Sequence, residues 1–203
     1  MPSPAKVALV MLAAGAASRF GGRKLEALLG EEMVGTITAN QLLSLNFVEK
    51  FVVCSPADAA LTAAFDVLGL TQIPNDQPSL GLSHSISIAA QAADIADVDA
   101  LLICLADMPN VPLSHIQALL DAFDAEIIAS SCNGVAMPPA LFPRSQFAAL
   151  IALSGADGAR ALLTDATKIE ADAWSMADID TREDLDEISR SYRPSTTHTP
   201  YPS

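Results

Sequence analysis

Up to residue 130, short apolar runs alternate with longer segments of helical periodicity, and this alternation is the strongest constraint on the fold. The apolar runs cover residues 6–12, 50–54, 100–105 and 126–130. They are nearly continuously hydrophobic, which is typical of parallel strands that are buried on both faces. The segments with helical apolar spacing cover residues 34–45, 57–68, 83–93 and 113–123. This order predicts an α/β fold with three layers and a mostly parallel central sheet.

The pattern becomes weaker after residue 130. Residues 132–145 contain three prolines and are predicted to form a loop and edge structure. Residues 146–153 and 156–164 have helical character. Thr181, with Asp184 three residues later, resembles a capping box and predicts a last helix.

The length and composition favour a single domain. A chain of 203 residues with 51% hydrophobic residues is long and apolar enough to bury a core. We expect one domain over residues 1–190. Residues 191–203 are rich in Pro, Ser and Thr and are predicted to be a disordered tail.

Charge and cysteine usage narrow the classes of partner. The chain has 24 acidic and 11 basic residues, and its net charge of -13 argues against a nucleic acid or an anionic membrane as the main partner. No apolar run reaches the roughly 18 residues of a membrane span, and the apolar N-terminal stretch fits a first strand better than a signal peptide. The three cysteines lack metal-ligand spacing, and their odd number fits no complete disulfide framework. We therefore expect buried thiols and a cytoplasmic protein.

A basic, glycine-rich loop follows the first predicted strand, in the stretch LAAGAASRFGGRK at residues 12–24. It contains Arg19, Arg23 and Lys24, although basic residues are scarce elsewhere. In open α/β sheets, ligands bind beyond the carboxyl ends of the strands, where this loop is expected to lie. Its glycines let backbone amides approach a ligand closely and form an anion-binding concavity. The loop therefore suits a triphosphate or a pyrophosphate, and the alternative is a basic surface turn without a ligand.

Two familiar phosphate motifs do not fit this loop. A Walker A loop would need one residue fewer between Gly15 and Gly21, and Ser or Thr where Leu25 follows Lys24. The dinucleotide fingerprint G-x-G-x-x-G is also absent. The sequence therefore predicts a phosphate loop of another kind.

Carboxylates that could hold a metal occur at two places. Asp107 follows a buried strand and is placed to share the crevice with the glycine loop, so it is a candidate Mg²⁺ ligand. A turn aspartate before Pro109 is the alternative. Asp178 and Asp180 are candidates to complete the metal site, with surface capping as their alternative.

A third candidate segment covers residues 79–87, where a loop with Gly81 leads into a helix that begins with several hydroxyl residues. Such a segment can bind a base and a ribose through hydrogen bonds. A helix N-terminus without any ligand has the same composition, so this segment alone is a weak signal.

These motifs, in this order, resemble the molybdenum cofactor cytidylyltransferases and the molybdopterin-guanine-dinucleotide-synthase-like nucleotidyltransferases. The matching stretches are LAAGAASRFGGRK (12–24), GLSHSI (81–86), LADMP (105–109), PPALFP (138–143), SGADGARALL (154–163) and DIDTREDL (178–185). The resemblance extends from residue 7 to about residue 188. It implies a Rossmann-like, glycosyltransferase-A-like nucleotidyltransferase fold.

The resemblance also implies a reaction. Relatives that use GTP typically have L-A-G-G where this chain has Leu12-Ala13-Ala14-Gly15, so the branch that uses CTP is favoured. That branch transfers CMP from CTP to molybdopterin and releases pyrophosphate. The product implies a recipient molybdoenzyme or its chaperone as a partner. The alternatives are GTP as donor, another phosphate acceptor, or a nucleotide-binding or cofactor-binding module without turnover.

The resemblance assigns roles to single residues. Asp107 and Asp180 are expected to bind Mg²⁺, and Asp178 is the alternative to Asp180 as the second ligand. Arg19 and Lys24 would act with Asp107 in catalysis by neutralising the phosphates of CTP. The nucleotide contacts are expected at Leu12, Ala13, Ala14, Gly15, Lys24, Gly81 and Ser83, together with the Ala16 amide. Arg160 is expected on the pterin side.

Overall fold

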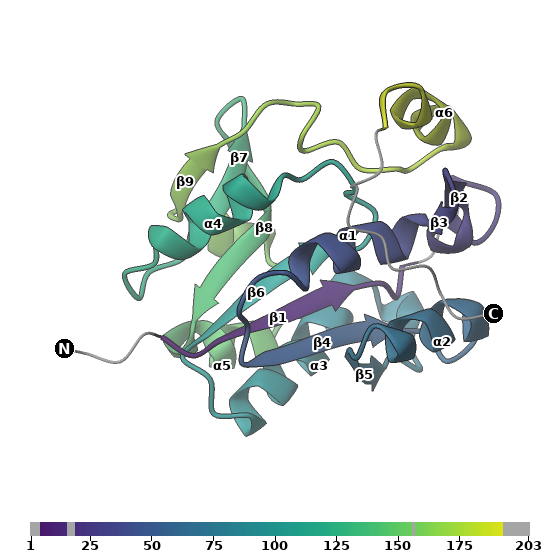
Figure 1. The fold of residues 1–203 in the computed structure, drawn as a ribbon. Helices are drawn as coiled ribbons and strands as arrows, with labels where there is room; N and C mark the ends of the chain where they lie inside the picture. Colours follow the sequence, from purple (N-terminus) through teal and green to yellow (C-terminus); the bar gives the residue numbers. More distant parts are fainter. Residues whose placement is uncertain (1–4, 16–18, 156, 193–203) are drawn as a thin grey trace.

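The computed structural model describes residues 5–15, 19–155 and 157–192, and its centre is a seven-stranded sheet (Figure 1). The strand order is β5-β4-β1-β6-β8-β7-β9. The strands are β1 (Val7–Leu12), β4 (Glu49–Cys54), β5 (Thr71–Pro74), β6 (Ala100–Leu105), β7 (Ile128–Cys132), β8 (Val135–Pro143) and β9 (Thr167–Glu170). Residues 193–203 of the predicted tail and the Ala16 amide lie outside the described residues.

The sheet is mostly parallel, as predicted. Strands β5, β4, β1 and β6 run parallel to their neighbours, and so do β7 and β9. Only β8, among the strands of the described residues, is antiparallel to both of its neighbours, β6 and β7. The carboxyl ends of β1, β4 and β6 therefore meet at one edge, where the glycine loop begins.

Strand β1 is buried on both faces because its side chains alternate between two cores. Leu9 and Met11 belong to one hydrophobic cluster, and Ala8, Val10 and Leu12 belong to the other. A strand covered by helices on both sides needs apolar residues at every position. This is why the first apolar run shows no alternation of polar and apolar residues.

Helices cover both faces of the sheet and complete the three predicted layers. They are α1 (Val34–Leu42), α2 (Ala59–Val67), α3 (Leu82–Ile95), α4 (Leu113–Asp121), α5 (Phe147–Ile151) and α6 (Arg182–Ser191). Buried residues of α1, α2 and α4 share one core with the sheet. Those of α3 and α5 share the core on the opposite face.

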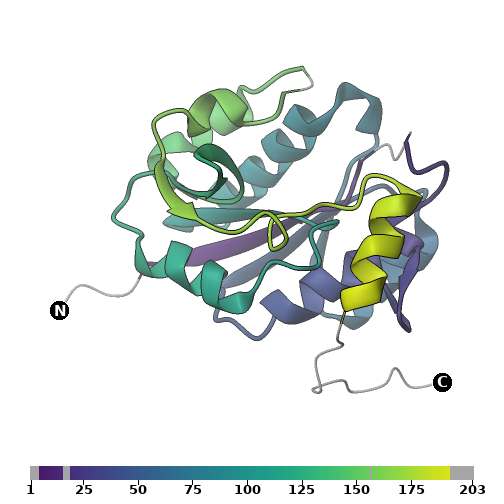
Figure 2. The ribbon, with the colours of Figure 1, turned by 90° about the horizontal axis from the view of Figure 1, so that it is seen from above.

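Helix α6 lies apart from these layers, beside a short hairpin of β2 (Leu28–Leu29) and β3 (Glu32–Met33) (Figures 1 and 2). A third cluster joins Ile188 of α6 to Phe20 of the glycine loop and to Val34 and Ile37 of α1. The last helix thereby packs against the segment that follows the glycine loop.

The predicted loop and edge structure at residues 132–145 is wrong, because most of this segment forms β8 inside the sheet. Prolines lack an amide donor and are tolerated in sheets mainly at bulges and strand ends. Here Pro138 and Pro139 fall in the register shift between Met137 and Ala140. The pairing with β6 begins only at Ala140, so neither proline interrupts a regular ladder.

Smaller differences concern short elements. The predicted helix at 146–153 is reduced to the five residues of α5, and 156–164 contributes a 3-10 helix at Arg160–Leu163. Three more 3-10 helices occur in the described residues, at Lys24–Glu26, Pro78–Leu80 and Arg144–Gln146. Strands β5 and β9 were not predicted, because they contain exposed polar residues instead of apolar runs. In the part of the chain that the structure describes, no helix has the length and apolar character for crossing a membrane.

Candidate nucleotide and metal site

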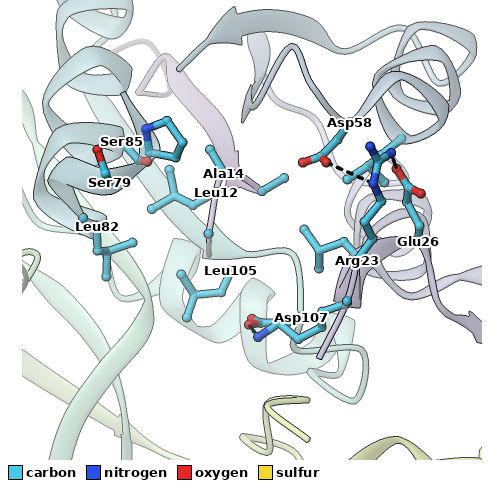
Figure 3. A pocket seen from close by; sticks show the side chains of 18 residues that line it. Leu12, Ala14, Arg23, Glu26, Asp58, Ser79, Leu82, Ser85, Leu105 and Asp107 are labelled. Carbon is cyan, nitrogen blue, oxygen red and sulfur yellow. Dashed lines mark hydrogen bonds and ion pairs between the residues drawn. The ribbon is translucent and has the colours of Figure 1, made fainter. Parts of the chain in front are cut away.

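A cavity of about 630 Å³ opens at the carboxyl ends of the central strands, where ligands of open α/β sheets bind (Figure 3). Its walls come from the glycine loop, the loop after β4, the start of α3 and the end of β6. The lining residues are Leu12, Ala13, Ala14, Gly15, Gly22, Arg23, Lys24, Leu25, Glu26, Asp58, Leu61, Pro78, Ser79, Gly81, Leu82, Ser85, Leu105 and Asp107.

Lys24 and Asp107, predicted to share one pocket, are in direct contact. Lys24 Nζ donates hydrogen bonds to Asp107 Oδ2 at 2.6 Å and to Asp180 Oδ1 at 3.2 Å. Burial of the ammonium lowers the pKa of Lys24, but the charges and hydrogen bonds of Asp107 and Asp180 outweigh this and raise it overall. Lys24 is therefore charged at neutral pH. It stands at the junction between the glycine loop and the carboxylates.

Asp107, Asp178 and Asp180 form an acidic cluster, in which one oxygen of each residue lies within 4.8 Å of the others. Desolvation and the like charges of Asp107 and Asp180 raise the pKa of Asp178. Asp107 Oδ1 is buried and has no hydrogen-bond partner among the described residues. A buried carboxylate oxygen without a partner is costly, and a bound cation would offset that cost. Three carboxylates are the donors that hard divalent cations prefer, so the residues present fit such an ion.

The start of α6 brings Asp180 into the acidic cluster. The predicted capping box is confirmed: Asp184 N donates to Thr181 Oγ1 at 3.2 Å, and Thr181 N donates to Asp184 Oδ2 at 2.7 Å. Asp180 N also donates to Asp184 Oδ2, at 3.0 Å. The neighbouring Ile179 N donates to the backbone oxygen of Asp107 at 3.0 Å. These bonds fix the backbone on both sides of Asp180 and tie it to the end of β6.

Arg19, the other predicted cation, lies at the rim of this arrangement. Its Nη1 pairs with Asp180 Oδ2 at 2.9 Å, and its side chain is 77% exposed. It does not line the cavity. The next residue, Phe20, is buried, and the Arg182 guanidinium of α6 lies 5.0 Å from its ring centroid.

Most of the residues expected to contact a nucleotide line the cavity. They are Leu12, Ala13, Ala14, Gly15, Lys24 and Gly81. Gly81 has a φ of 84°, a conformation that side chains rarely adopt, where the chain turns into α3.

Ser83, which was expected to contact the nucleotide, does not line the cavity. It is fully buried, and its Oγ accepts a hydrogen bond from Gly158 N at 3.1 Å, so it joins α3 to the segment before the last 3-10 helix. The serines that line the cavity are Ser79 and Ser85. Ser85 Oγ also accepts a hydrogen bond from Asn75 Nδ2 at 2.9 Å.

One wall of the cavity was missed from the sequence. Arg23 Nη1 donates to Glu26 Oε1 at 2.8 Å, Arg23 Nη2 donates to the Ala57 carbonyl at 3.0 Å, and Arg23 Nε lies 3.9 Å from Asp58 Oδ1. Asp58 stands at the start of α2, and nothing in the local sequence marks it as more than a helix start. Its proximity to a loop more than thirty residues earlier depends on the packing of α1 and α2, which no local pattern reveals.

A second cavity, of about 430 Å³, adjoins the first and shares Leu12, Leu82 and Leu105 with it. Most of its lining is apolar and comes from α3, β6 and β8. Arg160 and Asp157 contribute its charged groups among the described residues. The two cavities therefore lie next to each other, and the acidic cluster lies beside the first.

The model of the MobA-like NTP transferase domain matches residues 9–171. The chain belongs to the MobA-like NTP transferase family. The nucleotidyltransferase fold expected from the sequence motifs is thereby confirmed, with three layers and a mostly parallel sheet. Asp178 and Asp180 follow the matched residues, whereas Lys24 and Asp107 lie within them.

Similar proteins support this membership. The purine catabolism protein PucB of Bacillus subtilis (strain 168) is 30% identical over 195 residues, which cover 89% of this chain and 95% of PucB. A solved structure from Mycobacterium sp. strain JC1 is 25% identical with a TM-score of 0.81, covering 92% of this chain and 96% of that one. A manganese complex of a Mycobacterium tuberculosis protein is 21% identical with a TM-score of 0.77, covering 92% of this MobA-like chain and all of that one. The likeness at 21% identity shows the fold alone.

Proposed function

We propose that this MobA-like NTP transferase transfers CMP from CTP to the phosphate of a molybdopterin-type cofactor and releases pyrophosphate. The observation that carries the proposal is the contact of 2.6 Å between Lys24 Nζ and Asp107 Oδ2 at one end of the glycine-loop cavity. One triphosphate bound at this end could contact both the Lys24 ammonium and a metal ion held by the Asp107 carboxylate. The residues at Leu12-Ala13-Ala14-Gly15 support CTP over GTP as the donor.

We assign a divalent cation, Mg²⁺ in this proposal, to Asp107 and Asp180, with Asp178 as a further carboxylate of the cluster. The buried Oδ1 of Asp107 supports this assignment, because a carboxylate oxygen without a partner is suited to a cation. The related mycobacterial fold in complex with manganese supports a divalent ion as well. When bound, the ion would supply positive charge to the triphosphate oxygens.

The chain's own cations would hold the phosphates. Lys24 and Arg19 belong to the glycine loop and each contact Asp180, so both can exchange a carboxylate partner for a phosphate oxygen. The Ala14 and Gly15 backbone lines the cavity from the same side. Together these groups would neutralise the charge that develops on the leaving pyrophosphate.

The acceptor would occupy the second cavity, with Arg160 facing its phosphate or its polar ring edge. An acceptor phosphate oxygen attacks the α-phosphorus, the bond between that phosphorus and the β-phosphate oxygen breaks, and pyrophosphate leaves in line. The attacking phosphate is already an anion at neutral pH, so no residue has to remove a proton. The shared lining of Leu12, Leu82 and Leu105 supports a reaction at the junction of the cavities.

The decisive experiment is a panel of CTP, GTP, UTP and ATP with molybdopterin as acceptor, followed by pyrophosphate release. We expect turnover with CTP and a requirement for a divalent cation. If GTP is the one nucleotide that supports turnover, the donor is GTP and not CTP. If turnover requires a phosphate acceptor other than molybdopterin, the proposed acceptor is wrong. Tight CTP binding without turnover would indicate a binding module in place of a transferase. A molybdoenzyme or its chaperone is the proposed recipient of the product.

A further inference from the structure

The two ends of the first cavity carry different polar groups, and the proposed function orients a bound nucleotide between them. Lys24 and Asp107 stand at one end, which can hold the triphosphate and its metal. At the other end, Asp58 faces Ser79 and Ser85 across the cavity (Figure 3). With the phosphates near Lys24, the base of the nucleotide has to occupy the end with Asp58.

Asp58 occupies the position of a helix cap but does not act as one. It is the N-cap residue of α2, yet its side chain accepts no hydrogen bond from the backbone of that helix. An N-cap aspartate normally makes such a bond, which stabilises a helix by roughly 0.5–2 kcal/mol. Figure 3 shows the carboxylate of Asp58 turned into the cavity, towards Ala14. The carboxylate of Asp58 therefore faces the cavity and does not cap the helix.

The neighbouring guanidinium leaves the Asp58 carboxylate available. Among the described residues, Arg23 makes its short ion pair with Glu26, at 2.8 Å, whereas Arg23 Nε lies 3.9 Å from Asp58 Oδ1. A distance of 3.9 Å is too long for a hydrogen bond. Arg23 thus leaves the acceptor oxygens of Asp58 free of a hydrogen bond from its guanidinium.

We infer that Asp58 selects the base of the donor nucleotide by accepting a hydrogen bond from an exocyclic amino group, that of cytosine in the proposed reaction. The inference rests on the proposed function, because it requires a nucleoside triphosphate in this cavity. An ionised carboxylate only accepts hydrogen bonds. Cytosine presents an amino donor at C4, whereas uracil presents a carbonyl oxygen there. Asp58 therefore favours CTP and repels UTP, two nucleotides of nearly the same shape.

The variant Asp58→Asn tests this role directly, because the amide can donate a hydrogen bond to the uracil oxygen. Asn is as good an N-cap residue as Asp, so the start of α2 is preserved. Binding of CTP and UTP is measured by calorimetry with Mn²⁺ and without acceptor. We expect the wild-type protein to prefer CTP and the variant to narrow the ratio of CTP to UTP affinity by roughly 10- to 100-fold. The variant Asp58→Ala should lose CTP affinity without gaining UTP affinity.

The matched control is Glu26→Gln, which removes the same charge from the same Arg23 and the same wall. The control should keep the wild-type ratio of CTP to UTP affinity. An unchanged ratio in Asp58→Asn, or an equal change in Glu26→Gln, would overturn the inference and leave the proposed function standing. If the wild-type protein binds no triphosphate at all, the proposed function itself fails. If the wild-type protein prefers a nucleotide with another amino-bearing base, CTP is not the donor. The role of Asp58 is then tested by whether Asp58→Asn narrows the ratio of that nucleotide's affinity to the UTP affinity.

Discussion

A single ammonium, that of Lys24, contacts two of the three carboxylates in the acidic cluster, at 2.6 Å from Asp107 Oδ2 and 3.2 Å from Asp180 Oδ1. The glycine loop and the proposed metal site are therefore not independent. The same side chain that would bind a phosphate competes with a cation for the same oxygens.

The first prediction concerns this competition. Lys24→Met removes the charge and keeps most of the length, so we expect Mn²⁺ alone to bind at least about tenfold more tightly. The same variant should bind CTP more weakly, since a charge-assisted hydrogen bond contributes about 1.5–3 kcal/mol. Manganese binding is followed by electron paramagnetic resonance and CTP binding by calorimetry. Arg23→Met is the control, because it lowers the charge of the same loop without touching the acidic cluster. If Mn²⁺ affinity rises equally in both variants, the effect comes from net charge and not from competition for the acidic cluster.

The second prediction concerns Asp107. Asp107→Asn keeps the side-chain volume and removes the charge, so pyrophosphate release should fall by roughly 100-fold or more if the residue holds the metal. Mn²⁺ affinity should fall in parallel. Circular dichroism should show an unchanged fold, because β6 and its neighbours keep their buried apolar residues. Near-normal turnover in this variant would remove Asp107 from the mechanism.

The proximity of Lys24 and Asp107 could be predicted from the sequence for a simple reason. Each follows the carboxyl end of a strand with a strong apolar pattern, and β1 and β6 are direct neighbours. Two loops at one edge of a parallel sheet must lie near each other. The capping box at Thr181 could also be predicted from the sequence, because it depends on residues only three positions apart.

Other features depend on contacts that are remote in the sequence. Ser83 and Ser85 look alike as hydroxyl residues at the start of α3, and only packing decides which of them lines the cavity. Ser83 is engaged by Gly158, 75 residues later. The prolines of β8 argued against a strand, because the register shift that accommodates them involves β7 and is not visible in the segment itself.

The third prediction concerns Asp184, which positions Asp180. Its carboxylate accepts hydrogen bonds from Thr181 N and Asp180 N, and the hydrogen bonds of the Thr181 side chain and backbone lower the pKa of Asp184. Asp184→Ala should lower the free energy of unfolding by about 0.5–2 kcal/mol and weaken Mn²⁺ binding, because Asp180 loses its backbone anchor.

Asp186→Ala is the control for Asp184→Ala. It removes the same charge from an exposed position of α6. Thermal unfolding and a Mn²⁺ titration are measured for both variants. If Asp184→Ala lowers stability and leaves Mn²⁺ affinity at the wild-type value, Asp184 caps the helix but does not position Asp180.

The fourth prediction is a pH dependence of stability that comes from His115. This residue of α4 is buried, and its Nε2 lies 2.9 Å from Ser130 Oγ, which donates its own proton to the Pro139 carbonyl at 2.8 Å. Ser130 Oγ can then only accept from the imidazole, so Nε2 carries the hydrogen. Burial lowers the pKa of His115 below its ordinary value of 6.5. The neutral ring therefore fits the folded protein.

The sign of the effect follows from linkage. Below about pH 6.5 the unfolded chain binds a proton at His115 more readily than the folded protein does, so the free energy of unfolding falls as the pH decreases towards the lowered pKa. His115→Gln keeps a donor for Ser130 but cannot titrate. Urea unfolding between pH 7.5 and pH 5 should therefore show a smaller loss of stability in the variant than in the wild-type protein. Identical pH profiles would mean that His115 has the same proton affinity in both states, despite its burial between α4 and the sheet.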